Sequence, residues 1–328
     1  MSDLARNHRL DLLRVIALMM IVLMHSPMPD SAPGFVLSGI SYLTAPGIGL
    51  FFMISGALLL DNNLSTKDFL NKRFTKILFP TLFWSVFYLI IKCCGGQMTN
   101  ISVFKSVFSI PFSAQGHGII WFMYTLAGLY LLAPILSQWL KQASKREVEF
   151  YLLLWAMTLL YPYLSKFLIV NEDETGVLYY LSGYLGYFLF GYYLTRHYRF
   201  RIIHPLLAIG VVIIVPMTLY CSGIEVDFYT MLWYLSMPVA LMAFCWFVLI
   251  NRCPNRKIVV INEISKLSFG IYFIHIFIMR NILWKINMIT ALPGILQIFV
   301  VMILTIFFSF IAVWLISRFP HSKYIIGV

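Results

Sequence analysis

Charged residues are scarce in this sequence. Aspartate, glutamate, lysine and arginine make up only 11% of its 328 residues, whereas 61% are apolar or aromatic. Soluble globular chains contain roughly 25% charged and about 45–50% apolar residues, so this composition excludes an ordinary water-soluble fold. Apolar segments recur from residue 10 to residue 318 without a change in composition. We therefore expect a single integral-membrane domain over residues 1–328, with no appended soluble domain.

Acidic residues are the rarer kind of charge. The chain has 13 acidic against 24 basic residues, which gives a net charge of +11. In a soluble chain this balance would suggest binding to nucleic acid. Here the basic residues lie mostly in short connectors between apolar segments, where they determine membrane topology. We therefore expect no nucleic-acid partner.

Several catalytic motifs are also missing. The five cysteines show neither zinc-ligand spacing nor the pattern of a secreted disulfide framework. There is no Gly-x-Ser-x-Gly nucleophile elbow, no phosphate-binding glycine loop and no pair of zinc-ligand histidines on one helix. We expect no metal cofactor, and the missing motifs leave open whether any catalysis would pass through a covalent enzyme intermediate.

The apolar segments predict membrane-spanning helices, each of which needs about 20 mostly apolar residues. Ten segments qualify approximately: 9–27, 40–60, 74–94, 119–138, 147–168, 176–195, 202–222, 229–250, 262–285 and 291–318. The first is a retained span rather than a cleaved signal peptide, because Asp11 and Arg14 interrupt its apolar core. Most basic residues lie in the termini and in alternate connectors, which places both termini in the cytoplasm. The predicted fold is an all-α polytopic bundle of about ten transmembrane helices.

The first predicted span carries an acid, an arginine and a histidine on one face. Arg14 and His25 are eleven positions apart, which at 100° per residue leaves them about 20° from alignment after three turns. Asp11 precedes Arg14 by three residues, within reach of an ion pair. An ionisable group in a bilayer costs at least about 2.5–3.5 kcal/mol, so this stripe should face the bundle interior or a wet cavity. The alternatives are an orienting ion pair for Asp11 and Arg14 and a hydrogen-bonded interior histidine for His25.

The same residues resemble a known pattern. Arg9, Asp11 and Arg14, followed after ten residues by His25, are similar to the start of the membrane-bound acyltransferase family 3, the O-acetyltransferase-like proteins of bacterial envelopes. Further segments resemble that family in the same order. These are Phe51–Gly56 (FFMISG), a basic loop with Lys72, Arg73, Lys76 and Pro80, the set His117, Trp121, Phe122, Tyr130 and Pro134, and Ile264–His275 (ISKLSFGIYFIH).

The resemblance implies transfer of an acyl group, usually acetyl from cytoplasmic acetyl-CoA, to a hydroxyl of a glycan or a lipid-linked saccharide. It also implies a bacterial inner-membrane location, with contacts to membrane lipids and room for a separate envelope-assembly partner protein. Histidine titrates near neutral pH, so His25 is the candidate base that removes the hydroxyl proton. Arg14, with Asp11 beside it, is the candidate for stabilising negative charge on the donor or the tetrahedral intermediate.

Other residues are candidate ligands. Arg73 and Lys76 would hold the phosphates of coenzyme A, or else they are ordinary topology charges. His117, Trp121 and His275 are candidates for acceptor binding. The alternatives are an exposed loop histidine for His117, an interfacial aromatic residue for Trp121 and a polar interior contact for His275.

Two other classes of function fit the same sequence. Charged residues inside a membrane also mark transport pathways, so a transporter or flippase of a lipid-linked sugar is the main alternative. Such proteins usually show related halves, and the sequence shows no internal repeat. A scaffold within a polysaccharide-assembly complex is a third reading, which predicts that the charged stripe tolerates substitution.

Overall fold

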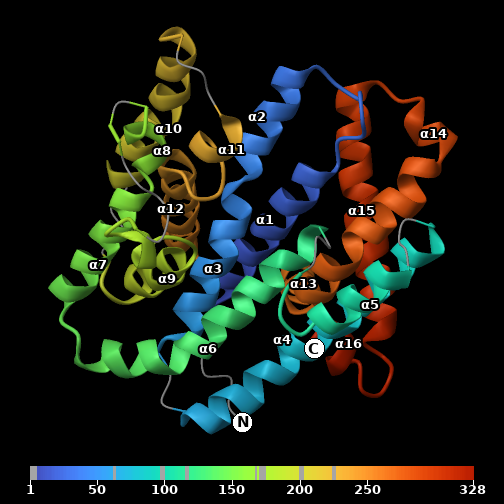
Figure 1. The fold of residues 1–328 in the computed structure, drawn as a ribbon, viewed down its shortest axis with the longest axis horizontal. Helices are drawn as coiled ribbons and strands as arrows, with labels where there is room; N and C mark the ends of the chain where they lie inside the picture. Colours follow the sequence, from blue (N-terminus) through green and yellow to red (C-terminus); the bar gives the residue numbers. More distant parts are fainter. Residues whose placement is uncertain are drawn as a thin grey trace. The chain divides into compact units, whose positions relative to one another are not determined.

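The regular structure is helical, as the composition predicted. A computed structural model describes residues 6–61, 64–96, 100–114, 118–166, 168–169, 175–198, 203–223 and 227–328, and these residues contain no strand. The longer helices (Figure 1) are α1 (His8–His25), α2 (Gly34–Thr44), α3 (Pro46–Leu59), α4 (Thr66–Cys94), α5 (Asn100–Ser109), α6 (Trp121–Gln142), α7 (Lys145–Thr158), α9 (Leu185–Arg196), α10 (Ile203–Cys221), α12 (Met237–Arg252), α13 (Val259–Ile276) and α15 (Gly294–Ile316).

The chain divides into two compact units. Unit 1 comprises residues 1–62 and 136–265, and unit 2 comprises residues 63–135 and 266–328, so the division falls inside α6 and α13. In unit 1, α1 packs against α2, α3 and α12, while α3 also packs against α9, and α10 against α12. In unit 2, the short C-terminal helix α16 (Lys323–Ile326) packs against α4, and α15 packs against the turns that follow α13.

Side-chain caps determine where several helices begin. Asn7 accepts a hydrogen bond from the backbone N–H of Arg9 and so caps α1. Ser65 caps α4, and Ser144 with Glu147 forms a reciprocal capping box at α7. Each cap satisfies backbone donors that the first turn of a helix leaves without a partner.

Six helical segments among the described residues are long and apolar enough to cross a membrane. They are Gly34–Leu59, Thr66–Cys94, Gly118–Gln142, Ile203–Cys221, Val259–Lys285 and Gly294–Ile316. The other four predicted spans overlap α1, α7, α9 and α12. Helix α1 carries three charges, and α7, α9 and α12 have 14, 12 and 16 residues, fewer than the roughly 20 that a straight span needs. The count of ten spans and the cytoplasmic termini therefore stay predictions.

The start of α4 corrects the sequence analysis. The sequence analysis placed Lys72, Arg73, Lys76 and Pro80 in a basic loop, but α4 already begins at Thr66 and contains all four residues. The reason is local: Ser65 caps the helix and its hydroxyl also donates to Asp68 in the first turn. Arg73 and Lys76 therefore project from a helix and not from a flexible loop.

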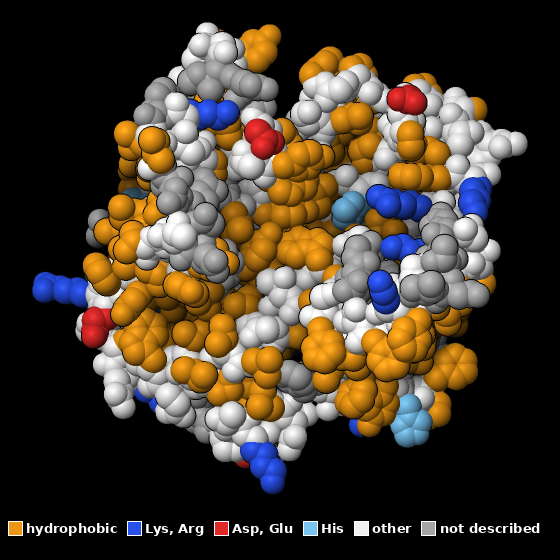
Figure 2. Space-filling view, in the orientation of Figure 1, with side chains coloured by type: hydrophobic (Ala, Val, Ile, Leu, Met, Phe, Trp, Pro, Cys, Tyr) orange, Lys and Arg blue, Asp and Glu red, His pale blue; other side chains and the backbone are white. Residues whose placement is uncertain are grey.

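Hydrophobic side chains cover much of the surface. Figure 2 shows them over broad areas of one face, with few charged groups between them. Helix α15 exposes large apolar residues along its length, including Ile295, Phe299, Ile303 and Phe307. Monomeric soluble proteins rarely expose such extended apolar surface, whereas lipid tails would cover it. Together with the six long apolar helices, this surface identifies a multi-pass membrane protein.

Candidate functional site

The charged residues of α1 form one hydrogen-bonded network at its first turns. Asp11 is buried, and its carboxylate accepts two bonds from Arg6, from Nε at 2.6 Å and from Nη2 at 3.0 Å. Ser265 on α13 donates its hydroxyl to Asp11 Oδ1 at 2.6 Å, and Arg14 Nη1 lies 3.5 Å from the same hydroxyl oxygen. The Ser265 hydroxyl thus lies between the carboxylate and the Arg14 guanidinium, all within unit 1.

The partners of Asp11 differ from the partner that its spacing in the sequence suggested. The expected neighbour of Asp11 was Arg14, whereas Arg6 binds the carboxylate through a bidentate ion pair. The hydrogen bonds that Arg6 donates to Asp11 raise the pKa of the Arg6 guanidinium above its usual value. The sequence analysis singled out neither Arg6 nor Ser265. Spacing along one helix signals neither contact, because Arg6 precedes the helix and Ser265 lies 254 positions away.

Removing the charge of Asp11 should destabilise this end of α1. In Asp11→Asn, Arg6 loses its bidentate acceptor and the two arginines repel each other without a compensating carboxylate. Breaking a buried pair typically costs about 3–5 kcal/mol, but Arg6 is 40% exposed, so we expect about 1–3 kcal/mol. The measurement is the apparent melting temperature of the detergent-purified protein, which should fall.

Asp61→Asn is the matched control. Asp61 pairs with Arg196, and both side chains are about half exposed. Exposed ion pairs contribute about 0–1 kcal/mol, so the melting temperature should hardly change. Equal effects of the two substitutions would show that the Asp11 network contributes no more than a surface ion pair.

His25 is the last residue of α1. Its side chain is partly buried, and Ser26 behind it is fully buried and donates its hydroxyl to the Val22 carbonyl at 2.7 Å. At 1.5 Å per residue, His25 and Arg14 are about 16 Å apart along the helix axis. The two side chains therefore lie on one face of a continuous helix, near opposite ends of it. Helix α1 also packs tightly along α3, where a Cβ on Gly47 would meet the Ala17 carbonyl oxygen at 2.9 Å.

A second histidine lies in unit 2. His275 is fully buried near the end of α13, and its Nδ1 is 2.6 Å from the Tyr272 carbonyl oxygen. A carbonyl only accepts, so Nδ1 carries a proton, and in the neutral form of the ring the lone pair is on Nε2. A π-helical turn, η3 (Phe277–Ile282), follows directly, and such turns are frequent at functional sites.

Unit 2 brings His275 and Trp121 into one aromatic cluster. The Tyr272 ring lies 5.6 Å from the His275 ring and 5.2 Å from Phe122, which in turn contacts Trp121 at 6.4 Å. The Tyr272 hydroxyl also donates to the Ile119 carbonyl, just before α6. The third predicted acceptor residue, His117, lies outside the described residues.

The predicted phosphate-binding residues occupy one stretch of α4. Lys76 is exposed, whereas Arg73 is partly buried. Within the described part of the chain, the Arg73 Nε is buried and has no hydrogen-bond partner. A buried guanidinium nitrogen usually has an acceptor, so an anionic ligand at this position would complete its bonding.

Comparisons with known proteins agree with this description. A family model described as an acyltransferase domain matches residues 7–314, from the cap of α1 almost to the end of α15. Comparisons with curated proteins and with solved structures found no match. The matched range includes Asp11, Arg14 and Ser265 of the charged network, the predicted phosphate ligands Arg73 and Lys76, and both histidines, His25 and His275.

Proposed function

Because this chain belongs to the acyltransferase family whose model matches residues 7–314, we propose that it is a membrane O-acyltransferase. It moves an acyl group, acetyl in the first instance, from cytoplasmic acyl-CoA to a hydroxyl of a cell-surface glycan or lipid-linked saccharide. The proposal places it in the bacterial inner membrane with both termini in the cytoplasm. The observation that carries it is the α1 stripe, in which an arginine held beside a buried carboxylate shares a helix face with a histidine.

The proposed reaction is direct transfer. His25 takes the proton of the acceptor hydroxyl while the hydroxyl oxygen attacks the thioester carbonyl. Arg14 offers its fixed positive charge to the oxyanion of the tetrahedral intermediate or to the donor. The carbon–sulfur bond then breaks, coenzyme A leaves as the thiol with the proton from the histidine, and the acceptor keeps the acyl group as an ester.

The site requires Arg14 to keep its orientation as the donor arrives. Asp11 and Ser265 support this, because they hold the first turns of α1 through bonds of 2.6 Å that do not involve a ligand. Preorganised charge is effective in catalysis because it needs no rearrangement during the reaction. The role of Asp11 in this proposal is therefore positioning.

A tyrosine-rich pocket in unit 1 supports a saccharide acceptor. Its volume is about 240 Å³, and its lining includes Tyr161, Tyr179, Tyr229, Thr158, Ser182 and Thr230. Aromatic faces stack on the apolar faces of sugar rings, and hydroxyl groups both donate and accept hydrogen bonds. The pocket lies at the end of α7 and near the start of the predicted spans 176–195 and 229–250, ends that the proposed topology puts toward the outer side.

The test is transfer in a defined membrane. Vesicles that contain the purified protein, supplied with acetyl-labelled coenzyme A and envelope glycan, should label the glycan above the level of empty vesicles. In cells, mass spectrometry should show that the acetyl groups of one envelope glycan disappear when the gene is deleted. Movement of an unmodified lipid-linked sugar across the vesicle membrane, with no label on the glycan, would instead identify a flippase.

A further inference from the structure

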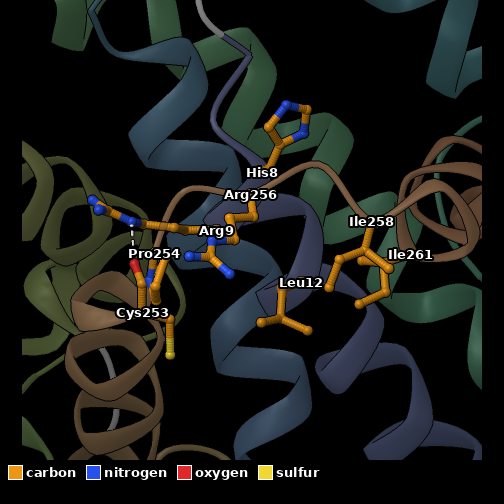
Figure 3. A pocket seen from close by; sticks show the side chains of 8 residues that line it. All are labelled: His8, Arg9, Leu12, Cys253, Pro254, Arg256, Ile258 and Ile261. Atoms are coloured by element: carbon orange, nitrogen blue, oxygen red, sulfur yellow. Dashed lines mark hydrogen bonds between the residues drawn. The ribbon is translucent and has the colours of Figure 1, made fainter.

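A basic pocket lies at the beginning of α1. Its volume is about 260 Å³, and all of its lining comes from unit 1: the first turns of α1, the segment that joins α12 to α13, and the first turn of α13. Figure 3 shows the two basic side chains Arg9 and Arg256 near Pro254, with the aliphatic side chains of Leu12, Ile258 and Ile261 on another side of the pocket. The pocket therefore combines a cationic part and an apolar part.

Hydrogen bonds between the two segments form the pocket before any ligand arrives. Arg9 Nε donates to the Cys253 carbonyl at 2.7 Å, which uses one of the five N–H donors of its guanidinium. The backbone N–H of His8 donates to Asn255 Oδ1 at 2.8 Å, and His8 Nδ1 lies 3.3 Å from Asn262 Oδ1. A preformed site loses less conformational entropy when a ligand binds.

The surroundings of the pocket are strongly positive. Residues 6–14 and 252–265 contain six arginines and lysines but only two carboxylates. One of these, Asp11, is already bonded to Arg6 and Ser265. Next to the basic groups, Ile258, Val259 and Val260 are at least half exposed. A small anion would contact only the basic side chains of the pocket, whereas an amphiphilic anion would contact both the basic side chains and the apolar ones.

We propose that this pocket binds the phosphate group of an amphiphilic phosphate ester. Guanidinium groups bind phosphate oxygens through charge-assisted, often paired hydrogen bonds, and the aliphatic wall accepts the apolar part of the same molecule. Two molecules carry this chemistry at a membrane surface: the coenzyme A donor and an anionic phospholipid. The donor assignment rests on the proposed acyl transfer, and the phospholipid assignment does not.

The test reverses one charge at a time. Arg256 and Lys257 are adjacent and both exposed, but only Arg256 lines the pocket. Arg256→Glu is therefore the test variant and Lys257→Glu is the control, with the same change in net charge. Neither side chain is part of the packed interior, so both variants should fold. Equilibrium binding of labelled coenzyme A is measured in detergent, and binding of phosphatidylglycerol is measured by native mass spectrometry.

The result shows which of the two ligands, if either, the pocket binds. A loss of at least tenfold in coenzyme A affinity for Arg256→Glu alone supports the donor as the ligand. The same loss for phosphatidylglycerol alone, relative to phosphatidylcholine, supports a phospholipid site. If the two variants bind each probe equally well, the proposal that this pocket binds phosphate is wrong. That conclusion would hold even if wild-type protein binds coenzyme A, as the proposed function requires. Binding of neither probe to the wild type would also overturn it.

Discussion

Replacing His25 with asparagine is expected to lower the rate of acyl transfer by about 10²- to 10⁴-fold, the usual contribution of a general base. Asparagine keeps hydrogen-bonding capacity at the end of α1 but cannot take a proton from the acceptor hydroxyl. The rate of label transfer from acetyl-coenzyme A should be measured in vesicles that contain equal amounts of wild-type and variant protein.

His321→Asn is the matched control for this experiment. His321 is exposed, follows the last long helix and has a φ of 66°, a backbone conformation that asparagine tolerates well. We expect no change in rate. His275→Asn tests the other histidine as the base. If it abolishes transfer while His25→Asn stays within tenfold of wild type, the base is His275 and our assignment is wrong, although the proposed function stands.

Replacing Gly191 with alanine is expected to disrupt the packing of α9 against α3. A Cβ at Gly191 would lie 1.9 Å from the backbone carbonyl oxygen of Met53, and one at Gly56 would lie 1.7 Å from that of Phe188. Small residues allow membrane helices to approach this closely, and a backbone carbonyl cannot rotate away as a side chain can. Overpacking in a core costs about 1–3 kcal/mol, and we expect a value at or above the upper end.

The measurement is thermal stability in detergent. A cost of about 3 kcal/mol predicts a fall in melting temperature on the order of 5–10 °C, or loss of a monodisperse protein. Gly210→Ala on α10 is the control, because nothing lies within 4 Å of its added Cβ. It should leave the melting temperature unchanged or raise it slightly, since alanine favours the helix. Equal stability of the two variants would contradict the close approach of α3 and α9.

The sequence predicted the helices better than it predicted their ends. The last predicted span, 291–318, corresponds to α15, which runs from Gly294 to Ile316. The α4 boundary was wrong because hydropathy measures the apolar part of a helix, whereas the Ser65 cap starts the helix two turns earlier in polar sequence. Likewise, α9 is much shorter than its predicted span of 176–195, because a 3₁₀ turn and an irregular segment precede Leu185.

Within the candidate site, the sequence alone determined that an acid, an arginine and a histidine share one face of the first helix. That conclusion needs only helical periodicity, which is a local property of the chain, and composition alone predicted the membrane environment. The tertiary structure decided that Arg6 and Ser265 hold Asp11, that Tyr272 orients His275, and that glycines bring α3 and α9 into contact. The contact of Ser265 with Asp11 and the contact of α3 with α9 join residues far apart in the chain. They exist only once the helices pack, so no local pattern specifies them.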